Sequence, residues 1–263
     1  IARVADGISF AWSHLCHQEL RKPFALDYDV VSTTFRRKDK TTPTDWRDAA
    51  DIHKRWALTQ AWCAKTVVQR QDIPDWLKRG SMRVQWDLRA DGKPKAAADW
   101  VARHWNEHFA PLPPFVTFFG FEHAGSWIAP KYVPFYPSDE AFRDATRRIR
   151  GMDGHVFLFP SSYQWTLTYN KQPDGSFQWD DHADFGQRAR LHAILNRDGS
   201  VFSRPHSWLR GGESAGLCRG DAWARQFLGD TVMQLLDRGV DVVQMDQVVG
   251  GQWPAGAKSP CFS

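Results

Sequence analysis

The chain has 263 residues, 42% of them hydrophobic and 24% charged, and its formal net charge is +4. This composition is typical of a globular protein with one large domain or two modest ones. The basic residues are scattered except at positions 36–40, which we interpret as a solvated loop, and no apolar run approaches the ~20 residues of a membrane span, so neither a nucleic-acid nor a membrane partner is predicted.

The cysteines and the two ends of the chain set further limits. The four cysteines stand far apart without metal-ligand spacing, so neither a metal nor a cofactor is predicted. The chain begins with Ile1 rather than Met, and it stops at Ser263 soon after the last predicted strand. We therefore expect a fragment of a longer protein. The sequence does not indicate an oligomeric state.

The first part of the chain is expected to end one domain and connect it to the next. Short β-rich pieces in residues 1–43, separated by polar turns, resemble the tail of a β-sandwich domain. A helix is predicted from Thr44, with Trp46 and Trp56 on its inner face. Residues 44–80 are assigned to a helical linker.

From residue 81 onward, strands alternate with helices. The strands are predicted at 82–87, 115–122, 155–160 and 240–247, and the helices at 95–109, 138–150 and 221–239, with a long polar insertion at 161–219. This alternation implies an α/β fold with a parallel sheet and right-handed crossovers. A (β/α)8 TIM barrel needs eight such units in ~250 residues, so residues 81–263 are predicted to form its first, N-terminal half. The alternative is a complete open four-stranded sheet.

The candidate site lies at the carboxyl ends of these strands. The first and fourth strands end in the same pattern, Gln-(Trp or Met)-Asp, at 85–87 and 244–246. Since side chains alternate along a strand, Gln and Asp share one face. The second strand ends in Glu122, and α/β enzymes place catalytic groups at such ends. Asp246 is predicted to be catalytic, whereas Asp87 and Glu122 either bind substrate or bond the backbone amides of a loop.

The aromatic residues favour a carbohydrate ligand. The chain has 14 Trp and 17 Phe, and aromatic rings stack on the faces of sugars, although they also fill cores. An aromatic loop with Trp127 follows the second strand and could supply a stacking wall. Glycoside hydrolysis fits this arrangement because it needs two carboxyl groups, one on each side of the scissile bond.

Six stretches carry a resemblance to a known family. They are residues 44–56, 72–77, 120–127, 132–137, 218–221 and 243–247. Together they resemble the glycosidase-like barrel family catalogued as domain of unknown function 6259. Its members are similar to glycoside hydrolases of the α-galactosidase and endo-α-N-acetylgalactosaminidase type. The resemblance extends from about residue 40 to residue 263.

The resemblance implies a retaining α-glycosidase with a carbohydrate substrate. In α-galactosidase-like relatives the acid that ends strand four is the nucleophile, which corresponds to Asp246. Their acid/base lies on a later strand, and no position in this chain can receive it, so the chain alone is expected to be inactive. A secreted or periplasmic bacterial protein is favoured. The residues expected to contact the sugar are Asp87, Glu122, Gln85, Gln244, Gln247, Trp127 and Trp86.

Three rival interpretations remain. A barrel without catalytic activity could bind glycans through its aromatic residues. Residues 212–216 match the G-x-S-x-G pattern of serine hydrolases, but we interpret them as a glycine-rich loop because no helix follows directly. The acidic cluster at 180–184 could bind a hard cation and serve a non-carbohydrate hydrolase, although it lacks the glycine spacing of a calcium loop.

Overall fold

A computed structural model describes residues 2–4, 7–9, 35, 41, 43–170, 178–205 and 212–246. The chain divides into two compact units, one formed by 18–81 and the other by 1–17 together with 82–263. Among the described residues, no helix is long and apolar enough to cross a membrane. At the amino end, β1 (Ala2–Val4) pairs with β2 (Gly7–Ser9) in an antiparallel manner. Their membership of a β-sandwich remains a prediction.

The smaller unit consists of short helices: α1 (Trp46–Ala57), η1 (Ala61–Cys63), η2 (Val67–Gln69) and α2 (Asp75–Lys78). Helix α1 begins two residues later than predicted, because Asp45 caps it: the Asp45 carboxylate accepts a hydrogen bond from the Arg47 amide at 2.8 Å. The predicted inner stripe is wrong, however. Trp46 is 73% exposed and Trp56 is 51% exposed. No second layer within the described part of this small unit buries the stripe.

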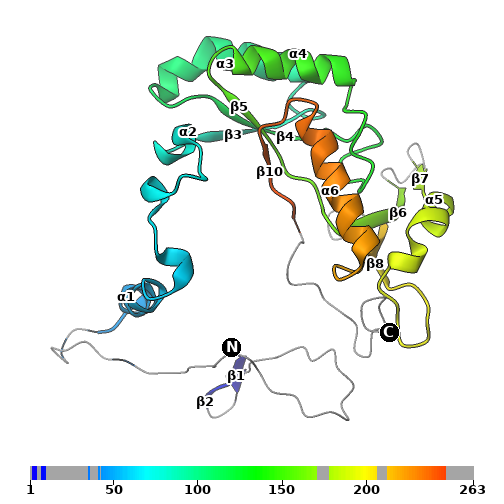
Figure 1. Cartoon of the computed structure of the whole chain (residues 1–263), viewed down its shortest axis with the longest axis horizontal. Coiled ribbons are helices and arrows are strands. Elements are labelled where there is room, and N and C mark those ends of the chain that lie inside the picture. The colour runs from blue at the N-terminus through cyan, green and yellow to red at the C-terminus, as the bar shows by residue number, and fades with distance from the viewer. Residues whose placement is uncertain are drawn as a thin grey trace. The chain divides into compact units, whose positions relative to one another are not determined.

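The larger unit is built on a parallel sheet in the order β10-β5-β4-β3 (Figure 1). Its strands are β3 (Arg83–Asp87), β4 (Phe115–Phe119), β5 (His155–Leu158) and β10 (Val242–Val243). All four predicted strands are present and parallel, although each is shorter than predicted. Each strand lies beside the next one along the chain. This order is that of consecutive barrel units, whereas a doubly wound open sheet reverses its order at a switch point.

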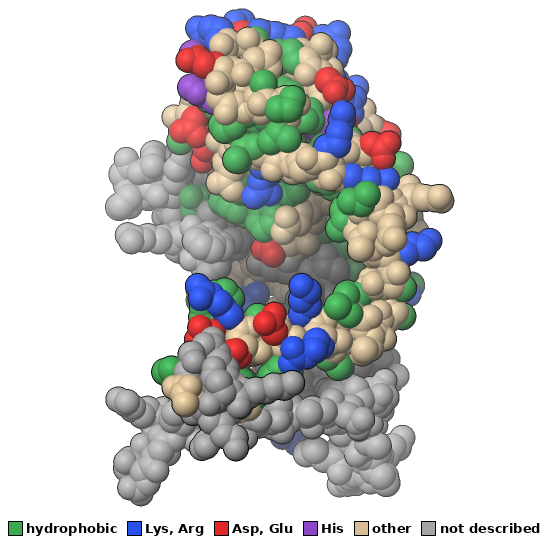
Figure 2. Space-filling view, turned by 90° about the vertical axis from the view of Figure 1, so that its left-hand side faces the viewer, with side chains coloured by type: hydrophobic (Ala, Val, Ile, Leu, Met, Phe, Trp, Pro, Cys, Tyr) green, Lys and Arg blue, Asp and Glu red, His purple; other side chains and the backbone are tan. Residues whose placement is uncertain are grey.

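Three helices cover one face of this sheet. They are α3 (Pro94–Phe109), α4 (Asp139–Arg150) and α6 (Ala222–Leu236), each preceding the next strand. The sheet residues that pack against them alternate along the strands, as period-two side chains require: Val84, Trp86, Val116, Phe118, Val156, Leu158 and Val243. Charged side chains cover the outer side of α3 and α4, with Lys and Arg gathered at the upper edge of Figure 2. The one-sided helix layer again matches a barrel segment.

The segment 161–219, which is predicted to be a long polar insertion, is inserted between β5 and α6 but folds around an apolar core. It forms an antiparallel sheet in the order β7-β6-β9-β8, together with α5 (His182–Arg188) and η3 (Arg190–His192). The strands are β6 (Gln164–Asn170), β7 (Gln178–Asp180), β8 (Ser203–Pro205) and β9 (Glu213–Gly216). Trp165 is fully buried in a core of its own, and Phe227 of α6 stacks on it at 5.7 Å. β7, β8 and β9 have only three or four residues each and are too short for a periodic signal, whereas β6 does alternate polar and apolar residues, a signal that the sequence-based prediction missed.

Replacement of Trp105 by Ala should lower the free energy of unfolding by about 3–5 kcal/mol, because it leaves a large cavity between α3 and the sheet. Trp105 is 1% exposed, and its indole donates to the Leu112 carbonyl at 2.7 Å. Leu191→Ala is the control, since Leu191 is 84% exposed and should change stability by less than about 0.5 kcal/mol. Urea denaturation measures both. Equal effects would contradict the assigned core.

Candidate functional site

The register of the parallel sheet decides which side chains share the face opposite the helices, where Thr117 and Phe157 are themselves buried. Gln85 is aligned with Thr117, Thr117 with Phe157, and Phe157 with Val242. Aligned residues share a face, and every second residue returns to it. Gln85 and Val242 therefore both lie on the face opposite the helices. Gln244, the residue two positions after Val242, belongs to this same face and is exposed.

Asp246 lies at the carboxyl end of β10. Its amide donates to the Pro160 carbonyl at 2.9 Å, and its own carbonyl accepts from the Ser162 amide at 3.0 Å. A parallel bridge to Ser161 continues the register of β5 and β10 without a slip. The backbone of Asp246 is thus fixed, and by the period of two its side chain belongs to the face opposite the helices. The residue is partly exposed.

Asp87 ends β3 on the same face, aligned with Phe119. Its Oδ1 accepts from the Arg89 amide at 2.8 Å and from the Ala90 amide at 3.2 Å. The Asp87 carboxylate therefore bonds the backbone amides of a loop, the second of its two predicted roles, and it closes the turn after β3. It remains partly exposed. Asp87 and Asp246 lie on the two edge strands, three interstrand spacings or about 14 Å apart along the sheet, which leaves room for a ligand between them.

Arg89 and Gly120 fix the loop that leaves β4, residues 120–137. Arg89 donates to the carbonyls of Gly120 and His123, each at 3.1 Å, and also to the carbonyl of Glu122. Gly120 has a φ of 65°, and a Cβ there would lie 2.9 Å from Oδ1 of Asp87. Only glycine fits this position. The strand consequently ends three residues earlier than predicted.

Glu122 is 3% exposed beneath this loop. Its Oε1 accepts from the Trp127 amide at 2.9 Å, while its Oε2 has no hydrogen-bond partner among the described residues. Burial raises the pKa of this carboxyl to about 7, although the hydrogen bond from Trp127 and the charge of Arg89 oppose the rise. The contact with Trp127 makes Glu122 a residue that holds the loop. Direct contact with a sugar stays a prediction.

Trp127 has a φ of 69° and is partly exposed. Its ring lies 5.7 Å from that of Phe119 and 6.2 Å from that of Phe159. Because Phe119 is aligned with Asp87, this aromatic cluster stands on the carboxyl edge of the sheet, beside the face that carries Asp87. The structure therefore brings Trp127 to the same edge as two of the predicted carboxylates, as a stacking wall requires.

The other predicted sugar-contacting residues are placed differently. Trp86 lies on the helix-covered face, where its indole donates to the Gly92 carbonyl at 2.7 Å and its ring lies 6.5 Å from Trp100. A sugar contact by Trp86 would have to come from the side opposite Asp87. Gln85 is exposed on the face of Asp87. Gln247 lies outside the described residues.

The two competing motifs have ordinary structural roles in the described residues. The G-x-S-x-G stretch contains β9 and is not a loop, which corrects the prediction, and no helix follows it directly. In the acidic cluster, Asp181 accepts from the indole of Trp165 at 2.7 Å, and Asp184 pairs with Lys131 and with Arg188. These carboxylates are therefore engaged in neutralising contacts. A group with metal-ligating geometry in the described part of the chain is elsewhere, on exposed turns of α3 at residues 104–108.

A polar face that the sequence does not predict lies on the small antiparallel sheet, where Gln164, Thr166, Ser214 and Arg204 share one side by register. Thr166 fastens this face to the loop 120–137. Its amide donates to the Ala129 carbonyl at 2.7 Å, and its hydroxyl accepts from the Ala129 amide at 3.1 Å. A motif scan could not find these residues, because they become neighbours only through strand pairing.

Gly120→Ala should destabilise the protein by about 1–3 kcal/mol, because the new Cβ meets Oδ1 of Asp87 in a backbone conformation that L-residues avoid. Gly186→Ala is the matched control. No atom lies within 4 Å of the added Cβ in the helix α5, so this change should be neutral or stabilise by up to about 1 kcal/mol. Thermal denaturation distinguishes the two. A neutral Gly120→Ala would refute the close approach.

Glu122 should make stability depend on pH. Since its pKa is about 7 in the folded chain against the usual 4.5, the folded state binds more protons, and stability falls as pH rises through this window. Relative to Glu122→Gln, the wild type should lose up to about 3 kcal/mol between pH 5 and pH 8. Denaturant unfolding at both pH values measures this loss. The exposed Glu140→Gln variant should keep the wild-type profile, and a wild-type profile in Glu122→Gln would contradict the assignment.

Comparison with known proteins shows fold similarity at low sequence identity. No curated protein matches the chain. An α-N-acetylgalactosaminidase from Bifidobacterium bifidum, in complex with Gal-NHAc-DNJ, is 13% identical with a TM-score of 0.51, over 76% of this chain and 32% of that one. An α-galactosidase from Thermus thermophilus, in complex with p-nitrophenyl α-D-galactopyranoside, is 13% identical with a TM-score of 0.46, over 63% and 31%.

A third solved structure, a cycloisomaltooligosaccharide glucanotransferase from Paenibacillus sp. with cycloisomaltoheptaose, is 10% identical with a TM-score of 0.46, over 70% of this chain and 26% of that one. The chain thus spans about a third or less of the length of these proteins. At a TM-score of 0.51, the Bifidobacterium enzyme shows that the parallel sheet resembles part of a glycoside hydrolase barrel. The profile of the family described as Domain of unknown function (DUF6259) matches residues 24–263, and the chain belongs to this family.

Proposed function

We propose that this chain is part of a retaining glycoside hydrolase that acts on α-linked glycans, with Asp246 as the nucleophile. The observation that carries the proposal is the position of Asp246. It ends the fourth parallel strand, on the face opposite the helices that also carries Asp87, and the aromatic cluster around Trp127 stands at the same edge. Carboxyl ends of parallel strands are where barrel enzymes hold their catalytic groups.

The proposed reaction has two steps. The Asp246 carboxylate attacks the anomeric carbon and forms a glycosyl ester while the bond to the leaving oxygen breaks, and that oxygen takes a proton from a second carboxyl group. Water then attacks the ester, gives its proton to the same second group, and releases the sugar and the Asp246 carboxylate. The second group is proposed to lie on a later strand of the barrel. Asp87 and Gln244 would bind hydroxyl groups, and Trp127 would stack on a ring.

The fold similarity supports this proposal, because the α-N-acetylgalactosaminidase that resembles this chain acts on α-linked sugars. By the same similarity we propose that residues 81–263 correspond to the first half of a (β/α)8 barrel. Residues 1–43 are proposed to end a β-sandwich domain, and residues 44–80 to link it to the barrel.

A glycan-binding barrel without catalytic activity is the alternative. It is favoured by the hydrogen bonds that Asp87 and Glu122 accept from loop amides. These bonds give both carboxyl groups a structural role. Such a barrel would bind sugar through Trp127 and the exposed glutamines without cleaving it.

Asp246→Asn tests the choice. In the complete protein encoded with this chain, the variant should hydrolyse p-nitrophenyl α-galactoside or α-N-acetylgalactosaminide at least about a hundredfold more slowly, the lower end of what one catalytic carboxyl contributes. Its unfolding midpoint should be unchanged. Asp237→Asn, at an exposed position after α6, is the matched control and should retain wild-type turnover. Retained turnover in Asp246→Asn would contradict the assignment of Asp246 as the nucleophile. Sugar binding without turnover in the wild type would favour a glycan-binding barrel without catalytic activity.

A further inference from the structure

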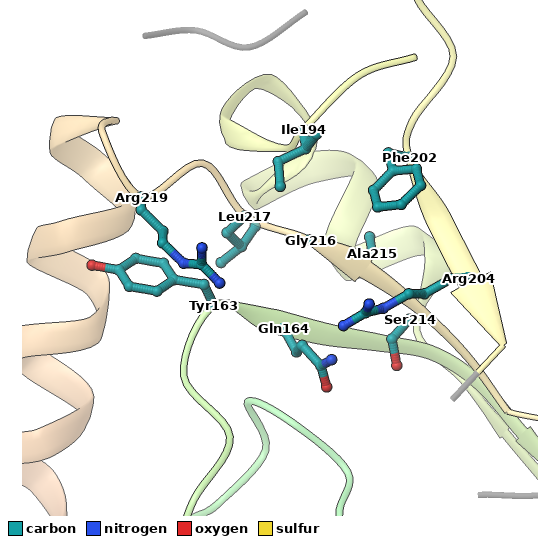
Figure 3. Close-up of a pocket in the computed structure, with 10 residues that line it drawn as sticks. All are labelled: Tyr163, Gln164, Ile194, Phe202, Arg204, Ser214, Ala215, Gly216, Leu217 and Arg219. Carbon is teal, nitrogen blue, oxygen red and sulfur yellow. The ribbon is translucent and has the colours of Figure 1, made fainter. Parts of the chain in front are cut away.

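A second binding feature lies on the polar face of the small antiparallel sheet. A shallow hollow, open to solvent, lies between β6, β8, β9 and the segment that follows β9, and a water-sized sphere can occupy about 40 Å³ of it. Its polar lining consists of Tyr163, Gln164, Arg204, Ser214 and Arg219, and no acidic residue lines it. Figure 3 shows the guanidinium groups of Arg204 and Arg219 directed toward one another from the two ends of the hollow.

Two buried polar atoms of this hollow lack a hydrogen-bond partner among the described residues. They are Oε1 of Gln164 and Oγ of Ser214, on side chains that are 8% and 2% exposed. A buried polar atom without a partner costs about 1–3 kcal/mol. Gln164 and Ser214 lie on neighbouring strands of one face, and both border the same hollow. This placement indicates a site for an external polar group.

The charge of the hollow indicates what that group is. Arg219 lies over the ring of Tyr163, with 5.9 Å between the guanidinium carbon and the ring centroid. Burial, together with the charge of Arg204, lowers the pKa of Arg219. Both guanidinium groups line the hollow, so an anion bound in it is attracted to two positive charges, and the planar fork of arginine matches the geometry of a carboxylate or a sulfate.

The hollow is close to the proposed catalytic edge. The amide of Ser162 donates a hydrogen bond to the carbonyl of Asp246. In the sequence, Ser162 and Gln164 are two residues apart. Their Cα atoms are therefore at most about 7 Å apart. Thr166, on the same face, is bonded to the loop that carries Trp127. A glycan with one residue at Asp246 would bring a neighbouring substituent to this hollow.

We propose that the hollow between Arg204 and Arg219 binds the oxyanion group, carboxylate or sulfate ester, of an acidic α-linked glycan. The glycan part of this proposal rests on the proposed function. Arg204 and Arg219 supply the charge, and the hydroxyl of Ser214 donates to the oxyanion. Oε1 of Gln164, which can only accept, takes a hydrogen bond from a hydroxyl group of the sugar. The hollow thereby selects acidic over neutral sugars.

Calorimetric titration of the complete protein with three matched ligands tests the proposal: the methyl α-glycosides of galactose, galacturonic acid and galactose 6-sulfate. At least one acidic ligand should bind tenfold or more tightly than methyl α-galactoside. The preferred ligand tells carboxylate from sulfate. Arg219→Gln and Arg204→Gln should each weaken its binding about tenfold to a hundredfold, the range expected for a hydrogen bond to a charged group.

Arg143→Gln removes the same charge from an exposed position on α4 and should leave all three affinities unchanged. Unfolding midpoints show whether each variant is folded, and either arginine variant suffices if the other does not fold. Equal affinity for neutral and acidic ligands would overturn the proposal and leave the glycosidase function standing. Preference for an acidic ligand, lost in the arginine variants but without hydrolysis by the wild type, would support the hollow and overturn the glycosidase function. Binding of inorganic sulfate alone, without preference among the three sugars, would also overturn the proposal that the hollow binds an acidic glycan.

Discussion

The unbroken register of the four parallel strands is the constraint on which the rest of the larger unit depends. A shift of one residue in any strand would exchange its two faces. Val84, Val116, Val156 and Val243 would then leave the helix layer, and the polar partners would enter it. The hydrophobic burial of one face thus fixes the position of Asp87 and Asp246 on the other. The placement of these carboxylates follows from packing energy on the opposite side of the sheet.

The small antiparallel sheet is the second determinant of the site. It is inserted between β5 and α6, and its core incorporates Trp223 and Phe227 from α6 itself. Leu235, near the carboxyl end of α6, belongs instead to the core of the parallel sheet. The amino-terminal part of α6 therefore packs on the insertion and its carboxyl-terminal part on the parallel sheet. Because α6 leads directly into β10, the insertion contributes to the position of the strand that ends in Asp246. Its first strand follows Ser162, whose amide donates to the carbonyl of Asp246.

The loop 120–137 shows how a carboxyl group near a catalytic edge acquires a structural role. Burial favours the protonated form of Glu122 near neutral pH, and the amide of Trp127 holds its Oε1. The same bond positions the ring that borders the edge of the sheet. Arg89 completes the loop through three backbone carbonyls. A stacking residue on such a support is preorganised, which reduces the ordering cost of binding a ligand.

The sequence alone determined the four parallel strands, the crossover helices and the carboxylates at the strand ends, because these follow from periods of two and 3.6 over long apolar stretches. It also determined the family resemblance. Tertiary structure decided the rest. The exposure of Trp46, the helix-facing position of Trp86 and the burial of Glu122 depend on what packs against each side chain. The common face of Gln164, Ser214 and Arg204 depends on pairing between strands distant in the sequence, which no local pattern encodes.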